Sequence, residues 1–77
     1  MNPDYSITSM QLDKGNWQVE NVSDEKLLVE INEQSIIFKC NKPGKYEVTI
    51  VDEQNNELIY LVEYHKQNGL IEVLLQE

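Results

Sequence analysis

The stretch that decides the fold is residues 58–75, which read LIYLVEYHKQNGLIEVLL. Asn68 and Gly69 near its middle are the strongest short signal for a β-hairpin, because both residues tolerate the positive φ angles that tight hairpin turns require. β-Branched, aromatic and leucine side chains dominate the two arms. This composition predicts two antiparallel strands, Leu58–Tyr64 and Leu70–Leu75.

Both arms of this hairpin are apolar on both faces, which is unusual for a small protein. A strand of this kind is normally covered on both sides. One interpretation is that the hairpin curls into the chain's own core. The other is that four residues meet another chain, such as a second copy in a homodimer: Ile59, Leu61, Ile71 and Val73. The sequence leaves both interpretations open.

Upstream of the hairpin, short alternating segments are separated by polar turns. Ile36, Phe38 and Cys40 share one face of such a segment, and Pro43-Gly44 is typical of a turn. No segment has a sustained helical period. We therefore predict one all-β domain over residues 1–77, either a small antiparallel β-sandwich or a barrel-like meander of six or seven short strands. The five further predicted strands lie at about residues 5–12, 17–22, 27–32, 36–40 and 46–50.

Residues 43–64 begin PGKYEVTIVD, and this stretch resembles the penultimate strand and following hairpin of bacterial immunoglobulin-like β-sandwich domains. The resemblance implies that Tyr46 forms a tyrosine corner, in which the hydroxyl bonds back to an upstream backbone group. The pattern departs from the family in having a further strand after Tyr64, and Trp17 matches the family's core tryptophan only loosely. The resemblance implies a fold and no activity.

The chain is strongly acidic, with 14 Asp and Glu against 6 Lys and Arg and a formal net charge of −8 over 77 residues. Such a charge disfavours direct binding to nucleic acid or to anionic membranes and favours a protein partner with a basic surface. An acidic surface also serves solubility alone. The candidate contact residues at predicted turns and exposed strand faces are Asp24, Glu25, Glu30, Glu33, Asp52, Glu53 and Glu57.

The sequence offers little for catalysis or for cofactor and metal binding. Cys40 and His65 are the only cysteine and histidine, too few for a structural zinc site. A calcium-loop spacing of oxygen ligands begins at Asp52, but Glu57 occupies the position that requires glycine. There is no glycine-rich phosphate loop. We expect no enzymatic activity, no cofactor and no metal.

Three functional hypotheses remain. The first is a protein-binding module, for example an acidic inhibitor that mimics nucleic acid, as anti-CRISPR proteins of phages and some nuclease inhibitors do. The second is an oligomerising assembly module that pairs exposed strand edges, for example in a virion. The third is a carrier with an apolar pocket lined by Trp17, Phe38, Tyr60 and Tyr64. The single cysteine and the lack of a signal peptide or membrane span favour a cytoplasmic location.

Overall fold

The structure is a computed structural model that describes residues 5–76, and it confirms the all-β prediction. The seven strands lie close to their predicted positions. Within residues 5–76 no helix is long and apolar enough to cross a membrane. The strands are β1 (Ser6–Gln11), β2 (Gln18–Val22), β3 (Leu28–Asn32), β4 (Ser35–Cys40), β5 (Gly44–Val51), β6 (Glu57–His65) and β7 (Leu70–Gln76).

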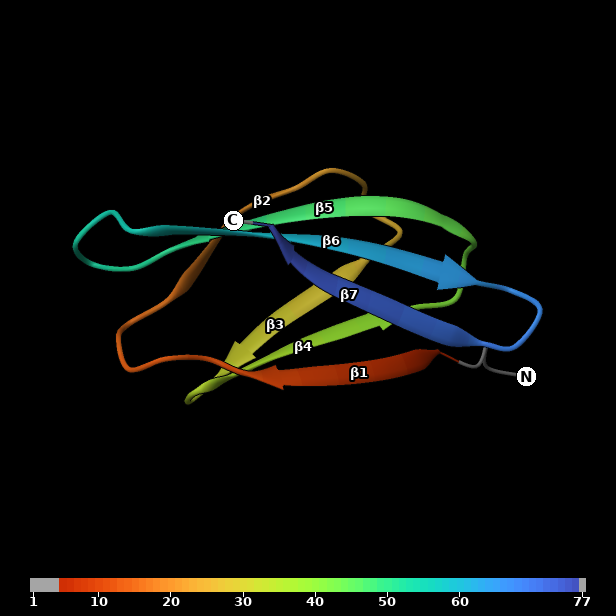
Figure 1. Cartoon of the computed structure of the whole chain (residues 1–77), viewed down its shortest axis with the longest axis horizontal. Helices are drawn as coiled ribbons and strands as arrows, with labels where there is room; N and C mark the ends of the chain where they lie inside the picture. The colour runs from red at the N-terminus through yellow and green to blue at the C-terminus, as the bar shows by residue number, and fades with distance from the viewer. Residues whose placement is uncertain (1–4, 77) are drawn as a thin grey trace.

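The strands form two antiparallel sheets that pack as a sandwich and do not close into a barrel (Figure 1). One sheet has the order β1-β4-β3, and the other has the order β2-β5-β6-β7. The strands run broadly along the long axis of the molecule, which measures 41 Å. Successive turns therefore alternate between the two ends of the sandwich.

The core lies between the sheets and consists of residues that alternate inward along each strand. Phe38 on β4 and Tyr60 on β6 meet across it, with ring centroids 5.6 Å apart in an edge-to-face arrangement. These two rings pack against each other instead of lining a pocket, which removes the basis of the carrier hypothesis. The buried apolar residues are Leu12, Leu27, Ile36, Phe38, Cys40, Tyr46, Val48, Ile50, Tyr60 and Val62.

Three of the predicted turns close hairpins. The β3–β4 turn places Glu33 at a φ of 56°, and Asn32 pairs with Ser35 on either side of it. The β6–β7 turn places Gly69 at a φ of 68°, and its N–H donates to the His65 carbonyl over 2.8 Å. The β5–β6 loop closes a third hairpin, in which Val51 pairs with Glu57. The sequence therefore identified the positions of all three hairpins.

The predicted turn around Pro43 is a link that carries the chain from one sheet to the other, because β4 and β5 belong to different sheets. The Tyr46 hydroxyl donates to the Lys42 carbonyl over 2.8 Å, and the Cys40 thiol donates to the same oxygen over 3.2 Å. Gly44 has a φ of 151°, and a Cβ there would lie 3.3 Å from the Tyr46 hydroxyl. Glycine thus makes room for the bond that anchors this link.

Candidate interaction surfaces

Three loops converge at one end of the sandwich, on the left in Figure 1. They are the β1–β2 loop, the β3–β4 turn and the β5–β6 loop. The Glu53 carboxylate accepts a hydrogen bond from the Asn16 backbone N–H over 2.8 Å. The Gln34 side-chain amide donates to the Gly15 carbonyl over 3.3 Å. The three loops are therefore tied together and present one surface.

The Asp52 carboxylate organises the β5–β6 loop from within. Its Oδ1 accepts the backbone N–H groups of Gln54 and Asn56 over 2.9 and 2.8 Å, and its Oδ2 accepts the Asn56 side-chain amide over 2.9 Å. The Asn56 hydrogen bond is the main reason that the pKa of Asp52 lies below its usual value. The loop holds its shape with a carboxylate that stays ionised at neutral pH.

Charge is distributed unevenly between the two ends. We call the end with the three loops the acidic end, because within residues 5–76 it carries five carboxylates and one lysine: Asp13, Glu33, Asp52, Glu53 and Glu57, with Lys14. We call the opposite end the lysine end. It holds five lysines (Lys26, Lys39, Lys42, Lys45 and Lys66), which are balanced by five carboxylates (Asp24, Glu25, Glu47, Glu63 and Glu72).

The seven acidic residues predicted as contacts do not form one face. Four of them lie at the acidic end, namely Glu33, Asp52, Glu53 and Glu57. Asp24 and Glu25 lie at the lysine end, and Glu30 on β3 has its carboxylate 3.8 Å from the Lys39 ammonium. Sequence reasoning overlooked Asp13. The usable signal was the alternation of successive turns between the two ends of an antiparallel fold.

The hairpin residues predicted as contacts divide between its two faces. Ile59 and Leu61 lie on the outer face of β6. The grouping of Ile71 and Val73 with them was wrong, because these two β7 residues pair with Tyr64 and Val62 on β6 and pack against the core. Directly opposed residues on neighbouring strands share a face.

The outer face of β7 instead carries Leu70 and Leu74, which are 55% and 64% exposed. Leu74 pairs with Leu61 and is the exposed apolar residue that the sequence interpretation missed. Counting residue pairs outward from the turn at Gly69 would have placed Leu74 opposite Leu61, since His65 and Leu70 form the first pair. Both faces of the hairpin are apolar, but the apolar residues of the outer face of β7 are Leu70 and Leu74 instead of Ile71 and Val73.

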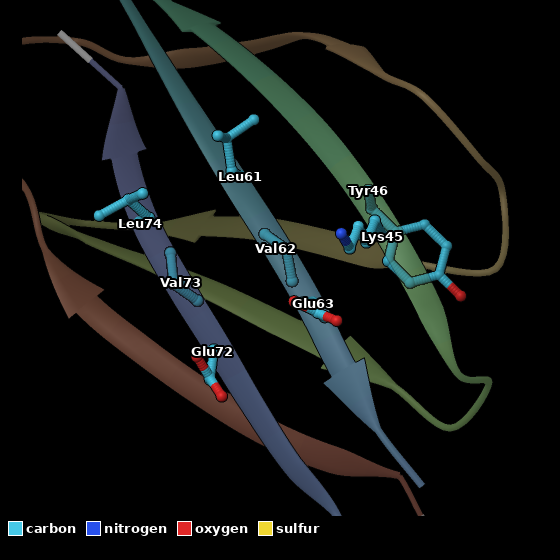
Figure 2. A pocket seen from close by; sticks show the side chains of 8 residues that line it. All are labelled: Lys45, Tyr46, Leu61, Val62, Glu63, Glu72, Val73 and Leu74. Atoms are coloured by element: carbon cyan, nitrogen blue, oxygen red, sulfur yellow. The ribbon is translucent and has the colours of Figure 1, made fainter.

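An open depression of about 400 Å³ lies over this part of the sheet (Figure 2). Leu61 and Leu74 lie side by side on it, with Lys45, Glu63 and Glu72 toward the lysine end. The depression is apolar at one end and charged at the other. It suits a side chain of a macromolecular partner better than an enclosed small molecule.

The described residues contain no obvious constellation for chemistry. Among residues 5–76, no three His, Cys, Asp or Glu side chains are arranged to hold a metal ion. Cys40 is buried, and its thiol donates to the Lys42 carbonyl. His65 Nε2 lies 2.9 Å from Glu72 Oε1 on the neighbouring strand. The absence of enzymatic activity stays a prediction.

The two long sides of the sandwich differ in how their strand edges are protected. On one side β2 contains an irregularity between Val19 and Asn21, and β3 carries the Glu30–Lys39 pair. Bulges and charges of this kind block pairing with a further strand. On the other side β1 has no charged residue and β7 has only Glu72, and both keep a continuous register.

We call the side formed by β1 and β7 the open side. The two edges meet where the Ser6 hydroxyl donates to the Gly69 carbonyl over 2.6 Å. Farther along β7 they separate, and Leu75 remains 40% exposed although it faces inward. Of eight exposed large apolar residues in the described part of the chain, five lie on this side: Tyr5, Ile7, Leu70, Leu74 and Leu75.

Comparison with known proteins gives no further guide to function: no family model matches the chain, and no curated protein or solved structure matches it significantly. The resemblance of residues 43–64 to immunoglobulin-like domains stays a prediction. The bond from the Tyr46 hydroxyl to the Lys42 carbonyl has the form which that resemblance implies. Function must therefore be argued from the surfaces themselves.

Proposed function

We propose that this chain is a non-enzymatic protein-binding module whose acidic end docks on a basic surface of another protein. The observation that supports the proposal is the convergence of five carboxylates and one lysine on three loops at that end. Loops held on a rigid β scaffold are common sites of binding. Direct binding to nucleic acid is disfavoured by the same charge.

The hydrogen bonds of the acidic end hold its loops in one conformation, so the surface is preorganised for binding. Asp52 and Glu53 fix the loop backbones through their carboxylates. The carboxylates of Asp13, Glu33 and Glu57 accept no hydrogen bond from within the described residues, and the three residues are exposed. They are available to lysine or arginine side chains of a partner. Complementary charge of this kind accelerates association and selects against acidic partners.

A finer proposal is that the partner is a nucleic-acid-handling enzyme and that the acidic end occupies its nucleic-acid site as an inhibitor. The rigid spacing of carboxylates on the three loops supports it, since carboxylates can take the place of phosphates in a basic groove. The separation of Asp24, Glu25 and Glu30 from this end limits the mimicking surface to the loops. Such binding should weaken steeply as salt concentration rises.

The test compares two triple variants of equal net charge. Asp13→Asn, Glu33→Gln and Glu57→Gln together neutralise the acidic end, whereas Glu20→Gln, Glu25→Gln and Glu47→Gln neutralise exposed carboxylates elsewhere. Each protein is used to capture partners from a lysate of the native host, and the captured proteins are identified by mass spectrometry. We expect the first variant to lose a basic partner that the wild type and the second variant retain.

Equal capture by both triple variants would contradict docking through the acidic end. For the inhibitor version, the captured enzyme is assayed for nucleic-acid binding with and without the chain. Competition that follows the same order of variants is the expected result, and simultaneous binding of the chain and nucleic acid would contradict it.

We also propose a cytoplasmic location. The support is Cys40, the single cysteine, which is buried as a thiol and takes part in no disulfide. A reducing compartment suits such a chain. Fluorescence microscopy of the tagged protein in the native host would test the location, and a signal confined to the cell envelope would contradict it.

A further inference from the structure

The free edge of β7 can accept a further strand. This edge is least covered in the second half of β7. Leu74 is 64% exposed on the outer face, and Leu75 is 40% exposed on the inner face. The contact between Ser6 and Gly69 lies before the start of β7, so β1 does not cover this half. An edge strand presents a row of backbone donors and acceptors that favours pairing with another strand.

The sequence of β7 is compatible with its own copy in one antiparallel register. When Leu74 pairs with the second copy's Leu74, Val73 pairs with Leu75 and Glu72 pairs with Gln76, and each pairing occurs twice. Apolar residues then meet apolar residues, and each carboxylate meets an amide donor. Antiparallel pairs of this kind bring side chains within contact distance.

The neighbouring registers that keep inner and outer faces aligned are less favourable. A register centred on Glu72 opposes two carboxylates directly, which is destabilising. A register centred on Val73 places Glu72 opposite Leu74 and Leu70 opposite Gln76, so polar groups face apolar ones. The Leu74 register places the Leu61–Leu74 pairs of the two copies side by side across the junction.

The distribution of charge also favours a second copy that pairs in the antiparallel orientation. Antiparallel pairing of β7 places the two long axes in opposite directions, because the strands run broadly along that axis. The acidic end of one copy then lies alongside the lysine end of the other. The five carboxylates at each acidic end then face a region whose five lysines balance its five carboxylates, instead of facing each other, which reduces the repulsion between two chains of net charge −8.

We propose that two copies of this chain form a symmetric dimer by pairing β7 with β7 around Leu74, which joins the two four-stranded sheets into one sheet of eight strands. The proposal goes beyond the proposed function, since it uses the open side and leaves both acidic ends exposed. The dimer presents two such ends and would therefore be a bivalent form of the module. In the dimer, the inward-facing side chain of Val73 on each copy packs beside that of Leu75 on the other, so that these side chains cover each other at the open side.

Analytical ultracentrifugation of the full chain tests the proposal. The paired segment is short, so we expect the mass to rise from 9.0 kDa toward twice that value between about 10 µM and about 1 mM. Leu74→Lys places two ammonium groups opposite each other and should raise the dissociation constant at least ~10-fold. Leu70→Lys is the matched control, because Leu70 lies on the same face and outside the paired segment.

Two further measurements test the register. Leu74→Lys and Leu74→Glu should each be monomeric, and an equimolar mixture should dimerise again, because residue 74 meets its own counterpart. Leu74→Cys should form a disulfide-linked dimer on oxidation while Leu70→Cys does not, since directly opposed antiparallel residues have Cα atoms within disulfide range, about 4.5–5.5 Å apart.

A wild-type mass of 9.0 kDa up to about 1 mM would overturn the proposal. Equal weakening by Leu74→Lys and Leu70→Lys, or no recovery in the mixture, would also overturn it. Species that grow beyond a dimer would indicate head-to-tail pairing of β7 with β1 instead. Retained partner capture by a monomeric Leu74→Lys variant would leave the function of the acidic end intact, which separates the two proposals.

Discussion

The two ends of the sandwich contrast in one titratable residue each, Asp52 at the acidic end and Tyr46 at the lysine end. At the acidic end, exposed carboxylates of Asp52 and Glu53 accept hydrogen bonds from backbone N–H groups. At the lysine end, hydroxyl groups of Tyr46 and Ser6 donate to backbone carbonyls. The first arrangement depends on ionised side chains, and the second depends on neutral ones. The difference shows that one small fold can respond to acid at one end and to alkali at the other.

Burial strengthens this contrast. Tyr46 is a buried residue, and desolvation, followed by its interaction with Cys40, raises its pKa to about 12. Asp52 lies in an exposed loop, and hydrogen bonds lower its pKa. Each shift favours the protonation state that makes the bond. Over the range between them, both ends keep their hydrogen bonds.

The largest effect should come from Gly44→Ala. The new Cβ would lie 3.3 Å from the Tyr46 hydroxyl on a backbone with a φ of 151°, so we expect a loss of about 2 kcal/mol in the free energy of unfolding. Gly15→Ala is the counterpart at the acidic end, where a Cβ would lie 3.3 Å from Trp17 Nε1 at a φ of 145°.

Trp17 is only partly buried, so its ring can move more easily than that of Tyr46. Urea unfolding followed by fluorescence should therefore show a larger loss for Gly44→Ala than for Gly15→Ala. A larger loss of stability for Gly15→Ala would contradict the expectation that the lysine end tolerates an added Cβ less well than the acidic end.

Tyr46→Phe should have the next largest effect. It removes the hydroxyl donor to the Lys42 carbonyl and should cost about 1 kcal/mol. Because the pKa of Tyr46 is raised from 10.0 to about 12, its contribution is present below pH 10 and is lost as the pH rises toward 12. The stability difference between wild type and variant, measured by urea unfolding, should shrink over that interval. A difference that stays constant with pH would contradict the role of the hydroxyl.

Asp52→Ala should have a smaller effect, since its hydrogen bonds are exposed to water. The lowered pKa of Asp52 means that its contribution is present above the usual carboxyl pKa and is lost as the pH falls below it. The difference from wild type at neutral pH should therefore shrink as the pH falls below the usual carboxyl pKa. Neither alanine nor asparagine ionises, so the differences of Asp52→Ala and Asp52→Asn from wild type should depend on pH in the same way, whereas Asp52→Asn, which keeps a side-chain acceptor, should show the smaller difference at neutral pH. Unequal pH dependence in the two variants would contradict an origin in the Asp52 carboxylate.

Glu33→Gly should produce the smallest change, and it should be a gain. Glu33 holds a φ of 56°, a conformation that glycine adopts without the steric cost of a Cβ. We expect a gain of about 0.5 kcal/mol, measured as a higher urea midpoint with an unchanged slope. A loss would show that the Glu33 side chain stabilises the turn, and the acidic end would then depend on one more carboxylate than described.

Most of the fold could be predicted from local pattern, because each strand alternates clearly and each turn carries its own residues. Asn68-Gly69 is sufficient to predict the β6–β7 hairpin, and the alternation around Phe38 is sufficient to predict strand β4. Assignment of strands to sheets could not be predicted in the same way. Whether β4 pairs with β1 or β5 depends on contacts between distant residues, and the link at Pro43 looks the same in either case.

The candidate surfaces were predicted less completely, for two physical reasons. The end at which a turn lies follows from counting the strands before it, but only when successive strands run in opposite directions, which local sequence does not state; Asp24 was thus grouped with Asp52. The face on which a strand residue lies depends on register, which one position reverses. Val73 was therefore placed outside and Leu74 overlooked.

The order of strands in the two sheets also bears on how the chain folds. The β5–β6 and β6–β7 pairs join strands that are neighbours in sequence, so short loops close them, whereas β1 must find β4, and β2 must find β5, across two intervening strands. Pairing of distant segments is the slower event. We expect residues 44–76 to form the folding nucleus and β1 to dock late. Hydrogen exchange should then show the strands' fastest native-state opening at Ser6–Gln11, so the N-terminal strand would control the lifetime of the closed sandwich.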